Sequence, residues 1–320
     1  MQKLSVIIPV FNESESINQL HSELKSVLNK NELNYEIIFV DDGSTDKSPE
    51  IITELVTNQS DCKAIFFRRN FGKSRALQAG FRHSSGDLLI TMDADLQDDP
   101  NDIPNFISKI NEGFDLVTGW KINRNDPLEK KIPSRLFNFI TSKFSGIPIH
   151  DFNCGFKADK KQLIDSIDLY GELHRYIPVL AYSHGFKIAE IPVKNHKRPF
   201  GHSKYGMERY LRGFFDSLTT SFLTKYNDRP MYFFGKIGLG LFIPGLIICI
   251  YLTIQWFMGY PIGTRPLLTL GILLMILGVQ AFSTGLISNM LVDVTFRQTY
   301  REHHIKEIQG FSVDEVMNEK

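Results

Sequence analysis

The sequence is poor in cysteine and has no excess charge of either sign. Its three cysteines, Cys62, Cys154 and Cys249, are far apart and odd in number. Such spacing excludes a disulfide framework and the paired-cysteine motifs of zinc modules. The 36 basic and 36 acidic side chains give a formal net charge of zero. Net charge therefore does not predict a polyanionic partner such as nucleic acid, and any electrostatic signal must be local.

The sequence also lacks the features of a secretory signal at its N-terminus. The apolar run from Leu4 to Val10 begins almost directly after Met1 and has no cleavage-type tail. It is too short for the apolar core of a signal peptide. The run therefore fits an apolar strand better than a secretory signal, and the cysteine content fits a reducing compartment.

The longest uncharged stretches lie near the C-terminus. No charged residue occurs from Ile237 to Thr264 or from Pro266 to Val292. Because about 20 apolar residues span a bilayer, the pattern predicts a transmembrane hairpin over residues 227–296, with helices over 234–258 and 266–292. Two buried helices of a soluble protein are the alternative, but the length, the charge gap and the flanks favour the hairpin.

Basic residues flank the predicted hairpin on both sides. The turn carries only Arg265, whereas the flanks carry Lys225, Arg229 and Lys236 before the hairpin and Arg297, Arg301 and Lys306 after it. A hairpin returns both ends to one side of the membrane, and the more basic side is normally cytoplasmic. We expect a multi-pass protein of the inner (plasma) membrane, with the N-terminal domain (1–226) and the tail (297–320) in the cytoplasm.

The first two hundred residues alternate short β-rich runs with helical patterns. Strands are predicted at 4–10, 35–40, 63–67, 88–92, 115–119 and 187–193. After the first strand, apolar residues recur at helical spacing, so one helix face is apolar. Repeated strand–helix order predicts an α/β fold with a mostly parallel sheet covered on both faces. Ligands of such sheets bind beyond the carboxyl ends of the strands.

Acidic loops follow the first two predicted strands. The first strand runs into Phe11-Asn12-Glu13, and the second runs into Asp41-Asp42-Gly43-Ser44. Many loops of this kind are simple turns. A carboxylate at a strand end can also accept hydrogen bonds from a base N–H or a ribose hydroxyl. Asp41 and Asp42 are therefore candidates for a nucleoside site.

The predicted strand 88–92 ends in a sharper pattern, Asp93-Ala94-Asp95-Leu96-Gln97. Alternate side chains of an extended chain share a face, so Asp93, Asp95 and Gln97 can converge. Two carboxylates repel each other unless a cation or another partner lies between them, and hard oxygen ligands suit Mg²⁺ or Mn²⁺. A solvated acidic loop is the alternative. The position after a buried strand, together with the other two strand-end loops, favours a metal that binds a diphosphate.

Together these segments resemble the family 2 glycosyltransferases, in particular the polyprenyl-phosphate branch that includes dolichol-phosphate mannose synthase and bacterial undecaprenyl-phosphate glycosyltransferases. The resemblance covers nearly the whole chain through the hairpin. Four motifs in order carry it: Ser5-Val6-Ile7-Ile8-Pro9-Val10-Phe11-Asn12-Glu13, Asp41-Asp42-Gly43-Ser44-Thr45-Asp46, Arg69-Asn70-Phe71-Gly72-Lys73 and Asp93-Ala94-Asp95-Leu96-Gln97. The resemblance implies a GT-A fold, a divalent metal (Mg²⁺ or Mn²⁺) and inversion at the anomeric carbon.

The same resemblance implies roles for residues on the donor side. The metal ligands on the donor diphosphate would be Asp93, Asp95 and Gln97, and Asp95 also counts as a catalytic residue. The nucleotide-binding set is Pro9, Phe11, Glu13, Asp41, Asp42 and Asp93.

Two further motifs of the family correspond to an acceptor site. The Ser-Arg-x-x-Asn pattern gives Arg135 and Asn138, and the Arg-x-x-Gly-x-Ser-Lys-Tyr pattern gives Arg198, Ser203 and Lys204. The second pattern lies in a basic stretch, 194–212, with six Lys or Arg and one Glu. Such a stretch suits a phosphate, but a solvated face or a patch that attracts anionic lipid has the same composition.

An aromatic stripe directly follows that basic stretch. Apolar side chains share one helical face at Met207, Tyr210, Leu211, Phe214, Phe215, Leu218 and Phe222. The pattern predicts an amphipathic helix at about 204–224 that lies in the membrane interface. Packing of the same face on the catalytic domain is the alternative, and both can hold.

Asp151 is the candidate for the catalytic base. The family motif Asp-x-x-Gly-x-Phe-Arg corresponds to Asp151-Phe152-Asn153-Cys154-Gly155-Phe156-Lys157, with Cys154 in place of the glycine. Some bacterial relatives carry an acidic residue just before the phenylalanine, where this chain has Gly155. A phosphate monoester has its second pKa near ~6 and is largely a dianion at neutral pH. Positioning can therefore replace a strong base, and Asp151 can instead orient the acceptor.

The sequence thus predicts a hexosyltransferase that uses a nucleotide sugar and a polyprenyl phosphate at a membrane and binds no nucleic acid. UDP-glucose is the expected donor, with other UDP-hexoses and GDP-mannose left open, and relatives suggest a homo-oligomer. A processive polysaccharide synthase is the nearest rival, but neither Trp120 nor Trp256 lies in a Gln-x-x-Arg-Trp motif. A silent scaffold that merely binds nucleotide sugar is the other rival.

Overall fold

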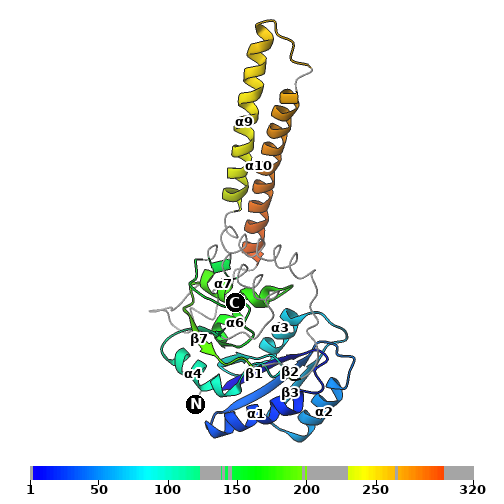
Figure 1. The fold of residues 1–320 in the computed structure, drawn as a ribbon, viewed down its shortest axis with the longest axis vertical. Helices are drawn as coiled ribbons and strands as arrows, with labels where there is room; N and C mark the ends of the chain where they lie inside the picture. Colours follow the sequence, from blue (N-terminus) through cyan, green and yellow to red (C-terminus); the bar gives the residue numbers. More distant parts are fainter. Residues whose placement is uncertain are drawn as a thin grey trace. The chain divides into compact units, whose positions relative to one another are not determined.

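The computed structural model describes residues 3–122, 138, 141–142, 146–196, 199, 230–263 and 266–298. The chain divides into two compact units, residues 1–224 and 225–320. The first unit is an α/β domain, and the second contains two long helices (Figure 1). Each unit is described by itself below.

The first unit is built on a seven-stranded sheet of order β3-β2-β1-β4-β6-β5-β7. All strands are parallel except β6, which is antiparallel to both of its neighbours, β4 and β5. The strands are β1 (Leu4–Val10), β2 (Tyr35–Asp41), β3 (Cys62–Phe66), β4 (Leu88–Thr91), β5 (Leu116–Lys121), β6 (Lys157–Lys160) and β7 (Ile188–Val193). This mostly parallel sheet confirms the predicted fold class.

Strand β6 is the one strand of the described sheet that the sequence pattern did not indicate. Its four residues, Lys-Ala-Asp-Lys, include three charged side chains and form no apolar run. The strand is nevertheless central, since it pairs with β4 and β5 on its two sides. Tertiary pairing, rather than local β-propensity, therefore creates this strand.

Helices cover both faces of the sheet because successive strand residues point to opposite sides. Val6 and Ile8 of β1 belong to one apolar cluster, and Ile7 belongs to the other. One face packs against α1 (Ile17–Lys30), α2 (Ser48–Asn58) and α4 (Ile103–Asn111), and the other packs against α3 (Lys73–His83), α6 (Lys161–Asp165) and α7 (Ile177–Ser183). Two short helical turns, η1 (Pro100–Asp102) and η2 (Leu173–Tyr176), precede α4 and α7.

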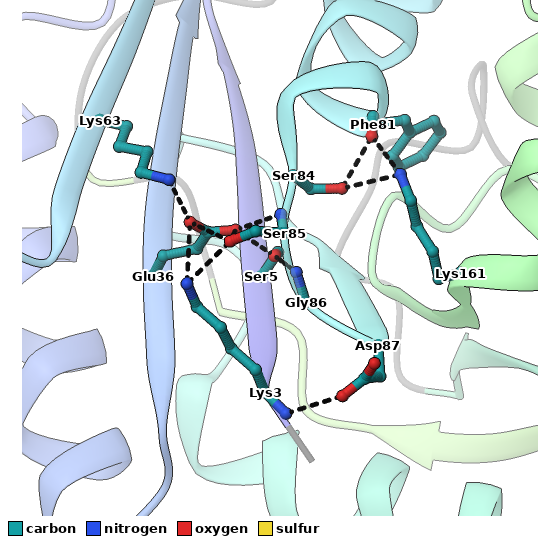
Figure 2. Close-up of polar contacts among 10 residues, drawn as sticks. All are labelled: Lys3, Ser5, Glu36, Lys63, Phe81, Ser84, Ser85, Gly86, Asp87 and Lys161. Carbon is teal, nitrogen blue, oxygen red and sulfur yellow. Dashed lines mark hydrogen bonds and ion pairs between the residues drawn. The ribbon is translucent and has the colours of Figure 1, made fainter.

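A buried carboxylate, Glu36, joins several segments at the amino-terminal edge of the sheet (Figure 2). Its oxygens accept hydrogen bonds from the Ser5 hydroxyl at 2.6 Å and from the Ser85 backbone N–H at 2.7 Å. The Lys63 ammonium lies 2.6 Å away, and that of Lys3 lies 3.4 Å away. Burial alone would raise the pKa of Glu36, but Lys63 and the serine hydrogen bonds outweigh burial and lower it to about 2.

The second unit is a hairpin of two apolar helices, α9 (Met231–Phe257) and α10 (Pro266–Gln298). Both are long and apolar enough to cross a membrane, over Met231–Phe257 and Pro266–Val292. The amphipathic helix expected at 204–224 lies outside the described residues. The tail expected at 297–320 does too, except for residues 297 and 298, which belong to α10.

Glycines allow the two helices to pack closely. A Cβ added at Gly238 would lie 2.8 Å from the carbonyl oxygen of Gly278, and one added at Gly245 would lie 2.8 Å from that of Gly271. The members of each pair face each other, and both helices carry glycines seven residues apart. Small residues at helix contacts are typical of membrane helices, whose association depends on close packing.

Candidate active site

The candidate site is built at the carboxyl edge of β1, β2 and β4. The loops after β1 and β2 are joined to each other by polar contacts of Asn12, whose φ of 54° lies in the left-handed region. Its backbone N–H donates to the Ser44 hydroxyl at 2.8 Å, and its side-chain oxygen accepts from the Thr45 N–H at 2.7 Å. The two acidic loops therefore form one rigid wall.

An open cleft of about 1190 Å³ lies against this wall. Phe11 and Asp41 line it, and so does the Arg68-Arg69-Asn70 segment. Asp41 uses one carboxylate oxygen to accept from the Ser44 N–H at 3.1 Å, while its Oδ1 is buried without a hydrogen-bond partner. An aromatic ring, a carboxylate oxygen and arginines at one cleft are the groups that can bind a nucleoside and its phosphates.

Asp42, the neighbouring candidate, has a structural role. Its two carboxylate oxygens accept the backbone N–H groups of Phe71 at 2.7 Å and Gly72 at 2.9 Å. Burial raises the pKa of Asp42, and these two hydrogen bonds offset part of that effect. The side chain therefore holds the Arg69–Lys73 loop in place, whereas Asp41 lines the cleft and keeps one oxygen without a hydrogen-bond partner.

Gly43 allows the same loop to approach closely. Its φ is 70°, and a Cβ placed there would lie 2.3 Å from the backbone carbon of Arg69. No other residue fits without displacing the loop, because the contact is with backbone rather than with a flexible side chain.

The third strand-end loop presents alternate side chains. Asp93, Asp95 and Gln97 are half-buried, whereas Ala94 and Leu96 are in the core. Leu96 has φ 60°, a left-handed conformation that costs a leucine roughly 1–2 kcal/mol. Strain of this kind is concentrated at functional sites, where the surrounding structure enforces it.

Lysines surround Asp93, which the sequence pattern did not reveal. The Lys73 ammonium is paired with the Asp93 carboxylate. Burial alone would raise the pKa of Asp93, but Lys73, Lys121 and Lys157 outweigh burial and lower it. Lys157 is itself buried, which lowers its own pKa, and its ammonium donates to the Cys154 carbonyl. Asp93 is thus neutralised by protein cations.

The residues fit a divalent cation at Asp95 and Gln97 better than at Asp93. Asp95 offers a carboxylate and Gln97 a side-chain amide oxygen, which are hard ligands for Mg²⁺ or Mn²⁺. The Gln97 backbone N–H donates to Asp95 Oδ1 at 3.2 Å, which orients the carboxylate within the loop. Asp93 faces Lys73 instead.

The sequence also did not predict an ion pair at the end of this loop. Lys121 at the end of β5 lies 2.7 Å from Asp98, whose side chain is fully buried. Burial alone would lower the pKa of Lys121, but Asp98 outweighs burial and raises it. The two residues are far apart in sequence, so no local pattern pairs them.

The chain after β7 runs alongside the same loop. Asn195 forms an isolated antiparallel β-bridge with Asp98, and the His196 N–H donates to the Gln97 carbonyl at 2.9 Å. The Lys194 N–H donates to Asp102 at 3.0 Å. The basic stretch that begins at Lys194 therefore starts beside Asp95 and Gln97.

Asp151 is buried and held by β7. Glu190 accepts the Asp151 N–H at 2.9 Å and the His150 N–H at 3.0 Å. His150 also contacts Glu190 through Nδ1 at 2.8 Å and stacks on Trp120 with ring centroids 4.2 Å apart. Asp151 accepts from the Asn153 N–H at 3.1 Å. Glu190, which had no sequence signal, thus fixes the backbone at Asp151.

Gly155 contacts the Asp93 carboxylate directly. A Cβ at this position would lie 2.7 Å from an Asp93 oxygen. The structure thus gives a reason for the glycine at this position, since a larger side chain there would crowd Asp93.

Most of the predicted acceptor residues lie outside the described residues, namely Arg135, Arg198, Ser203 and Lys204. Asn138 is described, and its Oδ1 is buried without a hydrogen-bond partner. Of the remaining nucleotide candidates, Pro9 ends β1 beside Val10, and the Glu13 N–H donates to the Ser48 hydroxyl at 3.0 Å.

Residues 5–167 match the model of glycosyl transferase family 2. The chain belongs to this family. It is 36% identical over 309 residues to a dodecaprenyl-phosphate galacturonate synthase of Rhizobium johnstonii, with 95% of this chain and 91% of the relative covered. It is 33% identical over 309 residues to an undecaprenyl-phosphate 4-deoxy-4-formamido-L-arabinose transferase of Enterobacter sp., with 94% of this chain and 92% of the relative covered. It is a glycosyltransferase with a polyprenyl-phosphate acceptor, as predicted.

Solved structures support the GT-A fold of the first unit. Glucosyl-3-phosphoglycerate synthase from Mycobacterium tuberculosis, crystallised with Mn²⁺, UDP and phosphoglyceric acid, superposes with a TM-score of 0.54 at 18% identity, covering 70% of this chain and 78% of that chain. The UDP complex of the same enzyme superposes with a TM-score of 0.53 at 17% identity, covering 70% of this chain and 80% of that chain. At these identities the likeness establishes the fold alone.

Proposed function

We propose that this glycosyltransferase transfers the sugar of a nucleoside diphosphate sugar to a polyprenyl phosphate with inversion, aided by Mg²⁺ or Mn²⁺. The observation that carries the proposal is the common edge of β1, β2 and β4. Asp41 lines a cleft there, and Asp95 and Gln97 follow β4, whose carboxyl end lies at the same edge of the sheet. Mn²⁺ in the related fold supports the choice of metal.

The chemistry needs positioning more than proton transfer. An oxygen of the lipid phosphate attacks the anomeric carbon, the bond from that carbon to the diphosphate breaks, and the nucleoside diphosphate leaves. Since the acceptor is largely a dianion at neutral pH, no proton has to be removed. Phe11 and Asp41 would bind the nucleoside, and Asp151 would orient the acceptor. A metal held by Asp95 and Gln97 would neutralise charge on the leaving diphosphate.

The sugar is best sought among those of the relatives. Their names specify galacturonate and 4-deoxy-4-formamido-L-arabinose rather than glucose. We therefore rank these two sugars ahead of the sequence-based choice of UDP-glucose, with GDP-mannose as a further alternative. Radiolabelled nucleotide sugars, each incubated with undecaprenyl phosphate and the full chain in detergent, will identify the donor. A product with many sugars per lipid would favour a processive synthase.

The role of Asp95 is tested by Asp95→Asn. We expect the rate of sugar transfer to fall by at least about a hundredfold. Removal of one group that stabilises charge in the transition state has an effect of this size. Asp168→Asn is the matched control, because Asp168 pairs with Arg82 at an exposed position away from the site. Full activity of Asp95→Asn in the presence of chelator would refute the metal role.

The acceptor side is tested at Arg198. Arg198→Ala should raise the KM for lipid phosphate more than the KM for the donor, because the arginine would bind the acceptor phosphate. Arg82→Ala, which removes an exposed arginine of a surface pair, is the control. Equal changes in both KM values would show that Arg198 does not bind the acceptor phosphate.

The membrane arrangement is part of the proposal. The apolar helices α9 and α10 would cross the inner membrane, and the basic flanks would keep the catalytic domain in the cytoplasm. Reporter fusions at the turn, residue 262, and after residue 320 should report opposite sides of the membrane. Reporters on the same side would exclude a spanning hairpin.

A further inference from the structure

A second group of ligand-type side chains lies at the opposite edge of the sheet from the active site. It consists of His21 on α1, Asp61 just before β3, and Cys62, the first residue of β3. One imidazole nitrogen, one carboxylate oxygen and the thiol sulfur lie within 4.8 Å of one another. Within the described ranges, no other group of three such residues lies this close together.

His21 is an unusual member of the buried face of α1. The other buried residues of this helix are Ile17, Leu20, Leu24, Val27 and Leu28, all apolar. The His21 side chain belongs to a residue only 7% exposed, and its Nε2 is buried without a hydrogen-bond partner. A buried polar atom left unpaired is destabilising, so a ligand that paired with Nε2 would be favoured. Burial and nearby Lys25 lower the pKa of His21, against the opposing charge of Asp61, which favours the neutral ring that a metal requires.

Asp61 is held in a suitable orientation by a neighbour. The Tyr35 hydroxyl donates to Asp61 Oδ2 at 2.8 Å, and the other oxygen, Oδ1, is buried without a partner. A hydrogen bond to one oxygen of a ligating carboxylate is the usual outer support of a metal site. Tyr35 therefore fixes the carboxylate and leaves Oδ1 for another contact.

Cys62 completes the set with a sulfur ligand. The residue is 4% exposed, and burial raises the pKa of its thiol to about 12. A thiol in this environment does not ionise alone, but a bound metal ion displaces its proton. A sulfur, an imidazole and one carboxylate are the mixed donors that suit zinc rather than Mg²⁺ or Mn²⁺.

The spacing is near that of a zinc site. Bond lengths of about 2.0–2.3 Å in a tetrahedral site place ligand atoms roughly 3.3–3.6 Å apart. Closing from the observed limit of 4.8 Å requires side-chain movements of about 1 Å. Lys25 opposes binding by its charge, with its ammonium 3.7 Å from Asp61 Oδ2.

We propose that His21, Asp61 and Cys62 bind one zinc ion, with water as the fourth ligand, at a site separate from the diphosphate metal. The ion would join helix α1 to the edge strand β3. Binding releases the Cys62 proton to solvent, and no oxidation is involved.

Cobalt is the probe for this site, because a thiolate bound to Co²⁺ gives a charge-transfer absorption that oxygen ligands do not. The full chain is purified in detergent, reduced, stripped with chelator and titrated with Co²⁺. We expect one equivalent to produce the band and Zn²⁺ to remove it. Cys62→Ser should lose the band, whereas Cys249→Ser, in helix α9, should keep it.

Two substitutions at the rim keep the test decisive if Cys62→Ser does not fold. Tyr35→Phe should weaken Co²⁺ binding roughly 10–100-fold, because Asp61 loses its outer support. Lys25→Met should strengthen binding, because a competing charge is removed. Zn²⁺ should also raise the melting temperature of the wild type but not that of Asp61→Asn. Absence of the band in the wild type, or its persistence in Cys62→Ser, would overturn the proposal.

Discussion

Replacement of Glu36 by glutamine is expected to destabilise the catalytic domain without touching the active site. Glu36 lies at the amino-terminal edge of the sheet, whereas the catalytic loops lie at the carboxyl edge. Glutamine keeps the shape but removes the charge that faces Lys63 and Lys3, and Figure 2 shows both ammonium groups directed at the carboxylate. Ser5 and Ser85 would keep only a neutral acceptor.

The magnitude follows from the pKa of Glu36. Folding lowers it from 4.5 to about 2, and each pKa unit corresponds to about 1.36 kcal/mol, which gives about 3 kcal/mol. Lys63 is half exposed, so solvent screening reduces the expected loss to about 2 kcal/mol. For a domain of this size, that loss lowers the melting temperature by roughly 4–8 °C.

The pH dependence gives a second, independent signature. Because the folded pKa of Glu36 is lower than the unfolded one, its contribution is fully present above pH 4.5. The contribution disappears as the pH falls from 4.5 to about 2. The difference in stability between wild type and Glu36→Gln should therefore shrink over this pH range and stay constant at higher pH.

Thermal unfolding of the full chain in detergent, followed by tryptophan fluorescence, measures both effects. Trp256 lies in α9, so Trp256→Phe in every variant leaves Trp120 of β5 as the reporter of the catalytic domain. Glu112→Gln is the control, because Glu112 is half exposed and pairs with Lys109 on the surface. A melting temperature of Glu36→Gln within about 1 °C of wild type at neutral pH would refute the reasoning, as would a difference that does not shrink in acid.

Three further predictions concern other buried positions. Gly43→Ala should weaken donor binding at least about tenfold in a nucleotide titration, because a Cβ would meet the Arg69 backbone at 2.3 Å. Lys121→Met should cost about 3–5 kcal/mol by leaving Asp98 buried without its partner, and a second change, Asp98→Leu, should restore much of the melting temperature. Asp159 is fully buried with both oxygens unpartnered, and burial raises its pKa from 3.8 to about 7. The stability of the wild type should therefore fall by up to about 4 kcal/mol as the pH rises from 4 to 7. At pH 8, thermal unfolding should show Asp159→Asn to be more stable than the wild type.

The sequence was sufficient to predict those features that depend on residues close together along the chain. Alternating strand and helix patterns predicted the parallel sheet, because each such element buries its own apolar face. The two uncharged stretches predicted α9 and α10, because about 20 consecutive apolar residues are enough to cross a bilayer. The strand-end motifs, in order, predicted the family. These motifs do not identify the sugar, and the names of the relatives specify galacturonate and 4-deoxy-4-formamido-L-arabinose.

Tertiary structure decided which of the candidate carboxylates remain available to ligands. From sequence, Asp41 and Asp42 are equivalent, but only the fold directs Asp42 to the backbone of the next loop. Lys73 and Asp93 are 20 residues apart, and Glu190 and Asp151 are 39 apart. Groups at such separations meet only after the strands have paired, and their interaction then depends on burial and distance, which no local pattern contains.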